Sequence, residues 1–319
     1  MHPANNSWDK LLLVPIFTFV YMKFQNQDVV EVKCGPSSAL FAPQHGGRLL
    51  KWELDGEQII YWPEQADWTT PRKIRGGNPL LFPFLARHVV DGQIGFWIDD
   101  TGIKREMPVH GFAHSLPFSY EIIEEGTAIR MVLNDSASTW PAYPYEFRFE
   151  AIYRLSGTSL EVTLVVCNGG HRPMPHYAGH HFYFSMPHEM RNSTALYLPA
   201  NERQTYRSDG TLSAADAGQS IYQLSDERLQ DHFHILKSQE DIRMVAPTLG
   251  REITLSLGKV AGGIPWYAIG TWTEKPDADS YCVEPWLGLP NAIHHKQGLR
   301  WLAPGQQEKA VCRIDVKFS

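Results

Sequence analysis

Alternation of apolar and polar residues with a period of two dominates the chain and predicts β-strands. Such runs, rich in β-branched and aromatic residues, are typical of strands that bury one face. A helical period of 3.6 residues is scarce, and Asp226–Gln239 is the best candidate for a short helix. The predicted strands are Arg48–Leu54, Gln58–Trp62, Ala128–Leu133, Phe147–Leu155, Leu160–Cys167, Glu252–Leu257 and Ala310–Phe318.

Turn signals connect several of these strands. Asp55-Gly56 has the easy positive φ that suits a tight hairpin turn, and Ser156-Gly157 plays a similar part between two later strands. The 25 glycines and 22 prolines are spread along the chain, and no linker, repeat or change in composition marks a boundary. We therefore predict an all-β fold, a large antiparallel β-sandwich with few short helices, in one domain over residues 22–319.

Residues 1–21 form an N-terminal extension whose role the pattern leaves open. The apolar segment Leu11–Met22 is shorter than the roughly 20 residues needed to span a bilayer. A single Lys10 precedes it, Pro15 interrupts it and no small-residue cleavage site follows, which disfavours a secretory signal. A signal therefore remains only one of three alternatives. In the other two, the segment is an extra edge strand, or Met22 is the start of the protein and opens the first strand.

Composition excludes several classes of protein. The 319 residues include 29 basic and 35 acidic side chains, so the net charge of −6 argues against a nucleic-acid binder. A hydrophobic share of 43% with 20% charged residues indicates a folded chain with a real core and no membrane association. The 10 Trp, 13 Tyr and 15 Phe are numerous enough to build stacking surfaces of the kind that bind sugar rings, although aromatic residues are also common in hydrophobic cores.

Four widely spaced cysteines, Cys34, Cys167, Cys282 and Cys312, show neither a CxxC motif nor the spacing of metal ligands. Their spacing argues against a disulfide framework and against a zinc site. Cysteines without disulfide partners are typical of proteins in a reducing compartment, so we expect a cytoplasmic protein.

The HHFYF segment is the first candidate for chemistry. In a strand, His181 and Tyr183 point to one face while Phe182 and Phe184 point to the other. An imidazole with a pKa near 6.5 can act as a general acid at neutral pH, although any one of 14 histidines is more often incidental. Because neighbouring strand residues face opposite ways, His180 and His181 cannot easily chelate one metal ion.

The CVEPW segment is the second candidate. Alternation places Cys282, Glu284 and Trp286 on one face of a short strand, which Pro285 confines to a sheet edge or a strand end. The apolar neighbours would raise the pKa of Glu284 towards that of a useful general base. Taken locally, an ordinary ion pair between Glu284 and one of the basic residues is the more common explanation.

Two further segments carry polar groups near glycines. Gly76-Gly77 lets the backbone pass close to a ligand or a neighbouring strand, with Arg75 and Arg87 on either side of an apolar run. No GxxxxGK[ST] motif is present, so this is not a phosphate loop, and a glycine bend before a buried strand is the simpler interpretation.

His110 and His114 lie four residues apart, which on a helix would form a metal-binding face. The neighbouring Pro108 and Gly111 favour a loop instead. We therefore do not assign a metal site to this pair.

Taken together, the motifs resemble the aldose 1-epimerase (galactose mutarotase) family. The resemblance covers the chain from about Phe24 to the C-terminus, and the motifs occur in the family's order. It implies the galactose mutarotase-like supersandwich fold, no cofactor, no metal, and interconversion of the α and β anomers of a hexose. The matching motifs are GGNPLLFP followed by Arg87, HGFA at His110–Ala113, YPYEF at Tyr143–Phe147, NGG…MP…GHHFYF, CVEPW at Cys282–Trp286 and LAPGQ at Leu302–Gln306.

The resemblance also implies roles for individual residues. The family's catalytic histidine falls on His181 and its catalytic carboxylate on Glu284. Its sugar-binding residues fall on Arg87, His110 and Asp231, the last in a loosely matching segment. A small-molecule sugar is then the expected partner, and we expect a monomer or a weak homodimer.

Departures from the family pattern leave the substrate open. His114 stands where relatives often have arginine, and Phe182 where proline is common. The IRGG segment at Ile74–Gly77 resembles hexose-6-phosphate 1-epimerases, where Arg72 or Arg75 would meet a phosphate. The EPWLGLPNA segment resembles the free-sugar branch instead. A non-catalytic carbohydrate-binding protein on the same fold is a third alternative, while a glycosidase would need a second paired carboxylate.

Overall fold

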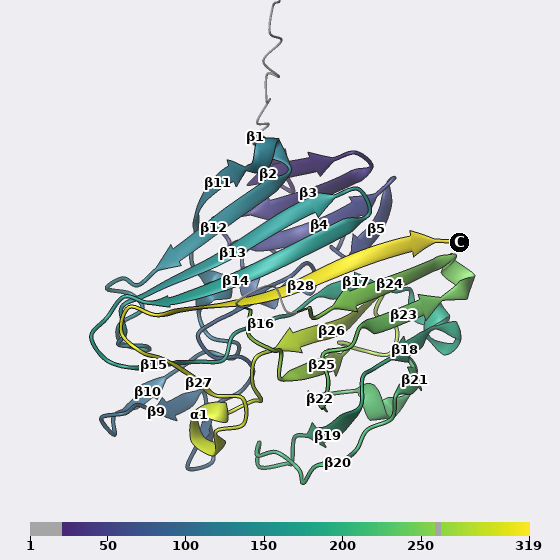
Figure 1. Cartoon of the computed structure of the whole chain (residues 1–319). Coiled ribbons are helices and arrows are strands. Elements are labelled where there is room, and N and C mark those ends of the chain that lie inside the picture. Colours follow the sequence, from purple (N-terminus) through teal and green to yellow (C-terminus); the bar gives the residue numbers. More distant parts are fainter. Residues whose placement is uncertain (1–20, 259–262) are drawn as a thin grey trace, which may run out of the picture.

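Two large antiparallel sheets dominate the computed structural model, which describes residues 21–258 and 263–319 (Figure 1). The apolar segment Leu11–Met22 lies almost wholly outside the described residues, so its expected role as an edge strand or a signal is untested. Within the described ranges, no helix has the length and apolar character needed to cross a membrane.

The first sheet has 13 strands and carries the N-terminal hairpins at one end. Strands that are distant in sequence meet at its centre, where β17 pairs with both β5 and β26. In spatial order the strands are β1 (Tyr21–Phe24), β2 (Gln27–Cys34), β3 (Ser37–Ala42), β4 (Arg48–Leu54), β5 (Glu57–Ile60), β17 (Tyr183–Ser185), β26 (Ser280–Trp286), β25 (Ala268–Trp272), β22 (His232–Leu236), β19 (Asn201–Thr205) and β20 (Asp216–Ala217), with β16 (Gly179–His180) and β6 (Leu80–Leu81) beside this path.

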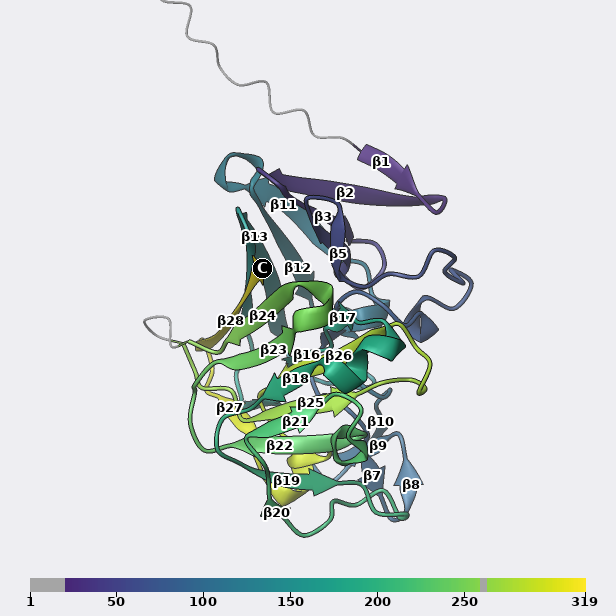
Figure 2. The same ribbon diagram turned by 90° about the vertical axis from the view of Figure 1, so that its right-hand side faces the viewer.

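The second sheet has nine strands and lies across the first. Figures 1 and 2 show its long strands in front of and beside the purple N-terminal strands. The order is β11 (Ser119–Ile123), β12 (Ala128–Asn134), β13 (Phe147–Ser156), β14 (Ser159–Asn168), β28 (Gln307–Phe318), β24 (Arg251–Ser256), β23 (Ile242–Ala246), β18 (Ala195–Tyr197) and β21 (Ile221–Gln223).

Three two-stranded ribbons and a few short helical turns complete the described fold. The ribbons are β9 (Phe96–Ile98) with β10 (Lys104–Glu106), β15 (Met174–His176) with β27 (Arg300–Leu302), and β7 (Val89–Val90) with β8 (Gln93–Ile94). The helical turns are α1 (Ala292–His295) and the 3₁₀ turns η1 (Pro71–Lys73), η2 (Ala113–Ser115), η3 (Glu124–Gly126), η4 (His188–Ser193), η5 (Glu227–Leu229) and η6 (Pro247–Leu249).

All seven predicted strands are present, with ends that differ by at most three residues from the prediction. Asp55 and Gly56 both take positive φ, 49° and 83°, in the tight turn between β4 and β5. In the second hairpin the paired residues are Ser156 and Ser159, so Gly157, with φ of 51°, is the first turn residue. The alternation and the turn chemistry were therefore sufficient to predict the local structure.

The predicted helix at Asp226–Gln239 is wrong. The segment forms the short turn η5 followed by strand β22, whose central residues Phe233, His234 and Ile235 are all buried. A strand buried on both faces has no polar alternation, so its apolar run is easily mistaken for part of a helix.

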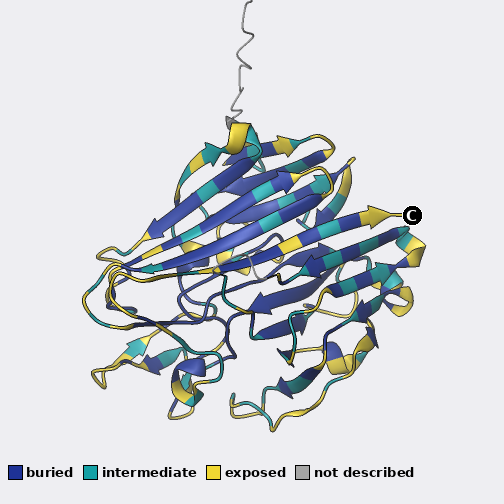
Figure 3. Ribbon diagram, in the orientation of Figure 1, coloured by how far each residue is buried: buried dark blue, intermediate teal, exposed yellow. Residues whose placement is uncertain are grey.

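The core lies between the two large sheets, and its buried residues form the dark bands across the strands in Figure 3. Aromatic rings from both sheets meet there. Phe41 of β3 lies 5.0 Å from Tyr153 of β13, and Phe82 stacks on Phe149 at 4.4 Å with an interplanar angle of 6°. This packing fixes one face of the first sheet and leaves its other face free to line a cavity.

Candidate active site

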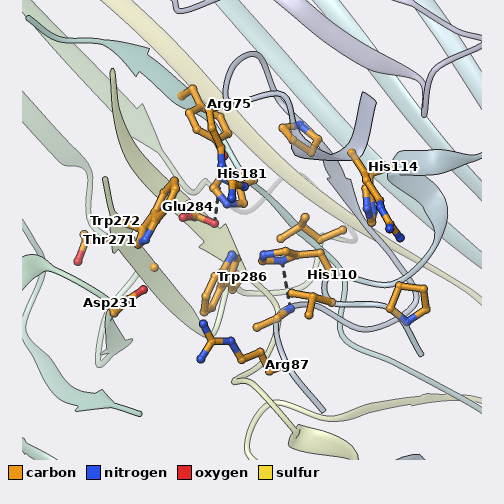
Figure 4. A pocket seen from close by; sticks show the side chains of 18 of the residues that line it. Arg75, Arg87, His110, His114, His181, Asp231, Thr271, Trp272, Glu284 and Trp286 are labelled. Carbon is orange, nitrogen blue, oxygen red and sulfur yellow. Dashed lines mark hydrogen bonds and ion pairs between the residues drawn. The ribbon is translucent and has the colours of Figure 1, made fainter. Parts of the chain in front are cut away.

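A cavity of about 510 Å³ opens on the face of the first sheet that points away from the second sheet (Figure 4). Its floor comes from central strands β17, β25 and β26, and its walls come from loops that are distant in sequence. The lining residues with polar or aromatic side chains are Arg72, Lys73, Arg75, Arg87, His110, His114, His181, Tyr183, Tyr206, Asp231, Phe233, Thr271, Trp272, Glu284 and Trp286.

The HHFYF segment delivers one imidazole to this cavity, as its alternation predicts. The rings of His181 and Tyr183 stack in parallel, 4.7 Å apart, and both line the cavity. Phe182 and Phe184 point the other way, into the core. His180 packs against Phe182 on that opposite side, so the two adjacent histidines do not share one ligand position.

Asn78, which the sequence motifs contained but did not single out, holds the histidine segment in place. Its Oδ1 accepts a hydrogen bond from the backbone N–H of His181 at 2.9 Å. Its Nδ2 donates to the Tyr153 hydroxyl at 2.8 Å and lies 3.0 Å from Nδ1 of His180. The side chain is fully buried. Because these partners lie 75 to 103 residues away, no local pattern could have identified this role.

Glu284 lies on a central strand, because β26 pairs with β25 on one side and with β16 and β17 on the other. The expectation that Pro285 would mark an edge or a strand end holds only for the end, since Pro285 is the second-last residue of β26. Trp286 lies against Gly270 of β25, where an added Cβ would be 2.8 Å from the indole ring. Glu284 is only 2% exposed.

His181 and Glu284 face each other across the floor of the cavity (Figure 4). Nδ1 of His181 lies 3.5 Å from Oε2 of Glu284, and neither atom has a hydrogen-bond partner among the described residues. The common alternative, an ion pair between Glu284 and a lysine or arginine, is absent from the described part of the chain. Buried polar atoms without partners are costly, so a facing pair of them indicates a functional site.

Burial moves the two pKa values in opposite directions. It lowers the pKa of His181 well below its usual value, and nearby His110 and Arg75 add to this effect. It raises the pKa of Glu284 well above its usual value, against a hydrogen bond from the Trp286 side chain. The expected imidazole pKa near 6.5 is therefore wrong for His181, because the ring is buried. Burial therefore favours the neutral form of each group, an imidazole beside a protonated carboxyl.

His110 is held rigidly at the cavity wall. Its ring Nδ1 accepts a hydrogen bond from the backbone N–H of Ala86 at 3.2 Å, and the backbone N–H of His110 donates to the Ala86 carbonyl oxygen at 2.9 Å. Burial lowers the pKa of His110 to about 3, so the ring is neutral and its proton is on Nε2. The ring lies 5.2 Å from that of His181. The following Gly111 is required, because an added Cβ would be 2.1 Å from the Phe82 carbonyl oxygen.

Arg87 and Asp231 lie at the exposed rim of the same cavity. The Arg87 guanidinium lies over the Tyr206 ring, 4.9 Å from its centroid. Asp231 has a φ of 52°, and its carbonyl oxygen accepts a hydrogen bond from Thr205 at 2.8 Å. Partial burial raises the pKa of Asp231, while Arg87 opposes that shift. All five residues that the sequence singled out therefore line one cavity.

Arg48, which sequence reasoning missed, holds the loop that forms the upper wall. Its guanidinium is 3% exposed and donates to the carbonyl oxygens of Pro71, Ile74 and Gly76 at 3.0, 2.6 and 2.6 Å. Burial lowers the pKa of Arg48 to about 10, so it remains charged at neutral pH. Gly77, with φ of 70°, passes so close to β4 that an added Cβ would lie 2.1 Å from the Leu49 carbonyl oxygen.

That loop carries three cations to the cavity, Arg72, Lys73 and Arg75. Arg75 pairs with Glu274 at 3.2 Å, and its guanidinium lies 5.3 Å from the Trp272 ring centroid. Both members of this ion pair are nearly half exposed. Water therefore screens the pair, and the arginine is free to exchange its partner for a ligand.

His114 also lines the cavity, in the 3₁₀ turn η2 rather than on a helix, as its neighbours predicted. Its buried Nδ1 has no hydrogen-bond partner among the described residues. Burial lowers the pKa of His114 to about 4, and Arg48 and Arg72 contribute.

Comparison with known proteins identifies a family. The family model described as aldose 1-epimerase matches residues 28–315. Protein LacX from Lactococcus lactis subsp. lactis is 23% identical over 270 residues, which cover 78% of this chain and 84% of that protein. A putative glucose-6-phosphate 1-epimerase from Cenchrus ciliaris is 27% identical over 142 residues, covering 44% of this chain and 41% of that protein.

The fold has close counterparts among solved structures. The galactose mutarotase related enzyme from Lactobacillus acidophilus superposes with a TM-score of 0.74 at 18% identity, covering 91% of this chain and 97% of that one. At this identity the likeness concerns the fold, which is the all-β arrangement of antiparallel sheets expected from the sequence.

Proposed function

The chain belongs to the aldose 1-epimerase family, and from this premise we propose that it interconverts the α and β anomers of a free hexose by acid–base catalysis. The observation that carries the proposal is the buried, unpartnered pair of His181 Nδ1 and Glu284 Oε2, 3.5 Å apart on the cavity floor. A buried acid and base that face one cavity are what ring opening requires.

The reaction needs two proton transfers and one bond cleavage. The C1 hydroxyl loses a proton, O5 gains one, and the C1–O5 bond breaks to give the open-chain aldehyde. Rotation about C1–C2 and closure on the other face give the second anomer, with both protons returned. Each positioned acid or base typically contributes about 10²–10⁴-fold in rate.

In our proposal Glu284 accepts the proton of the C1 hydroxyl while protonated His181 donates a proton to O5. The two residues exchange these roles when the ring closes. Burial favours Glu284 as the holder of the shared proton in the empty cavity. The proton therefore crosses to His181 when the sugar binds, because sugar hydroxyls then donate hydrogen bonds to the carboxylate that forms.

The remaining cavity residues would orient the ring. His110 presents its Nε2 proton, and Arg87 and Asp231 offer a donor and an acceptor at the rim. The indole of Trp286 forms an apolar wall between them. Holding the sugar between acid and base removes much of the entropic cost of reaching the transition state.

A hexose 6-phosphate is the second candidate substrate, and the charge around the cavity favours it. Four cations, Arg72, Lys73, Arg75 and Arg87, line a cavity that has Asp231 and Glu284 as its acidic residues. Guanidinium groups suit phosphate oxygens, with which they form paired hydrogen bonds. The partial similarity to a putative glucose-6-phosphate 1-epimerase points the same way.

The substrate is tested by following anomer equilibration. Freshly dissolved α-D-glucose, α-D-galactose and α-D-glucose 6-phosphate are each monitored by polarimetry or proton NMR, with and without the protein. Acceleration of a free sugar supports the main proposal, and acceleration of the phosphate alone supports the second. If sugars bind but none equilibrates faster, the chain is a non-catalytic carbohydrate-binding protein and the mechanism is wrong.

We also propose that the protein works in the cytoplasm. All four cysteines are free thiols, as a reducing compartment would keep them.

A further inference from the structure

A third potential ligand lies beside the acid–base pair. Cys282 is two residues before Glu284 on β26 and pairs across the sheet with Tyr183. One ligand atom each from His181, Cys282 and Glu284, an imidazole nitrogen, a thiol sulfur and a carboxylate oxygen, all lie within 4.8 Å of one another. The three residues are 7%, 1% and 2% exposed. The mechanism proposed above gives Cys282 no part.

Two of these side chains are already spaced as metal ligands. Zinc binds imidazole nitrogen and carboxylate oxygen at about 2.0–2.2 Å, so two such ligands on a tetrahedral ion lie roughly 3.3–3.5 Å apart. The distance between His181 Nδ1 and Glu284 Oε2 is 3.5 Å. Both atoms are buried and lack a hydrogen-bond partner among the described residues. A bound ion would satisfy both at once, and the Cys282 sulfur, within 4.8 Å of both other ligand atoms, would have to move into the coordination sphere.

We propose that His181, Cys282 and Glu284 form a binding site for a borderline-soft divalent cation such as Zn²⁺, and that the bound ion inhibits the enzyme by occupying the acid–base pair. One nitrogen, one sulfur and one oxygen ligand suit Zn²⁺ or Co²⁺. Mg²⁺ and Ca²⁺, which prefer oxygen ligands, do not fit this set. The fourth position faces the cavity, where a water completes the tetrahedron.

Binding exchanges two protons for one ion. The thiol of Cys282 releases its proton and becomes a thiolate, and the proton shared by His181 and Glu284 is also lost. The product is a neutral assembly of M²⁺, thiolate, carboxylate and neutral imidazole.

The ion and the sugar exclude each other at the reacting atoms. With the metal in place, neither His181 nor Glu284 can exchange protons with C1 hydroxyl or O5. Binding of the ion does not depend on which sugar is the substrate or on whether the proposed reaction occurs, whereas the inhibition rests on the proposed function.

The test is a titration with Co²⁺, whose absorption reports thiolate coordination. Other potential ligands are removed first, because Cys34 and Cys167 are partly exposed thiols and His188, Glu189 and Asp279 form an exposed cluster. A protein with Cys34→Ser, Cys167→Ser and His188→Ala should bind one Co²⁺ per chain with a sulfur-to-metal charge-transfer band and release two protons. Zn²⁺ should displace the Co²⁺, and Mg²⁺ should not.

In that background, Cys282→Ala should abolish the charge-transfer band and weaken binding at least about 100-fold, since loss of a direct ligand exceeds the cost of losing an outer-shell partner. Cys312→Ala, which removes another fully buried thiol, is the matched control and should leave the band unchanged. If Cys282→Ala does not fold, Cys282→Ser keeps the shape of the side chain with a poorer ligand.

An unchanged Co²⁺ spectrum in the Cys282 variant would overturn the inference, as would the absence of a stoichiometric site in the parent protein. If the protein also catalyses anomer equilibration, Zn²⁺ should inhibit it competitively with sugar, and Cys282→Ala should keep the activity while losing the inhibition. If the protein binds Co²⁺ in this way but accelerates the anomer equilibration of no sugar, the metal site is supported and only the acid–base function is refuted.

Discussion

At the scale of single residues, the five residues singled out from the sequence line one cavity, but the sequence did not predict the burial that shifts the pKa values of His181 and Glu284. The HHFYF and VEPW segments pointed to His181 and Glu284, and the resemblance assigned their roles. Their burial and missing partners are tertiary properties, because each is produced by strands far apart in sequence. An imidazole expected to titrate near neutrality is buried beside a carboxyl group, and burial lowers its pKa well below the usual value.

Substitution of His110 tests whether its rigidly held ring donates a hydrogen bond to the sugar. His110→Ala should lower kcat/KM about 10–100-fold, because one hydrogen bond to the sugar is lost. His110→Asn should retain more activity, since asparagine tolerates the positive φ of 68° and still carries a donor. Steady-state polarimetry on both variants measures the difference. Equal activity of the alanine variant and the parent would show that His110 does not contact the substrate.

At the scale of elements, the site depends on strands whose neighbours could not be read from the sequence. Central strand β26 brings Glu284 beside β17, and this pairing joins segments about 100 residues apart. The wrongly predicted helix at Asp226–Gln239 belongs to the same sheet, as β22. Periodicity identified strands such as β13, where exposed or half-exposed residues recur between buried ones, and failed at β22, whose three central residues are all buried.

Asn78 links three of these elements, and its removal should affect stability and activity together. Asn78→Ala leaves the His181 N–H and the Tyr153 hydroxyl without their partner, so we expect about 3–5 kcal/mol less stability. Urea denaturation measures the loss, and Asn192→Ala at an exposed position is the control. A loss below about 1 kcal/mol would contradict the anchoring role.

At the scale of the whole molecule, composition and motif order predicted the fold class and the family. They did not reveal the scaffold beneath the cavity. Arg48 holds the loop that carries Arg72, Lys73 and Arg75 by donating hydrogen bonds to carbonyl groups 23 to 28 residues away. No sequence motif signals such a contact. The sequence thus identified residues that line the cavity, but not the residues that hold them in place.

Buried neutral histidines should make the protein sensitive to acid. Burial lowers the pKa values of His88 and His234 to about 3 and that of His114 to about 4. In the unfolded chain they titrate near 6.5, so below that pH the unfolded state binds more protons and stability falls. Each contributes about 1.4 kcal/mol per pH unit.

Because an unfolded histidine is only half protonated at pH 6.5, the full slope is reached below that pH. The three histidines together should remove about 4 kcal/mol between pH 7 and 5.5, a large part of a typical folding free energy of about 5–15 kcal/mol. Thermal unfolding should accordingly show a Tm lower by about 10 °C at pH 5.5 than at pH 7. A Tm that does not change over this interval would mean that the histidines are protonated in the folded state.

The central claim is that Glu284 and His181 act as one acid–base pair. The most direct measurement is the rate of anomer equilibration of the accelerated sugar with Glu284→Gln, which is nearly isosteric, beside Glu161→Gln on the distant face of β14 as control. The account predicts a loss of about 10²–10⁴-fold for the first variant at unchanged Tm, and parental activity for the second. Full activity in Glu284→Gln would contradict the account.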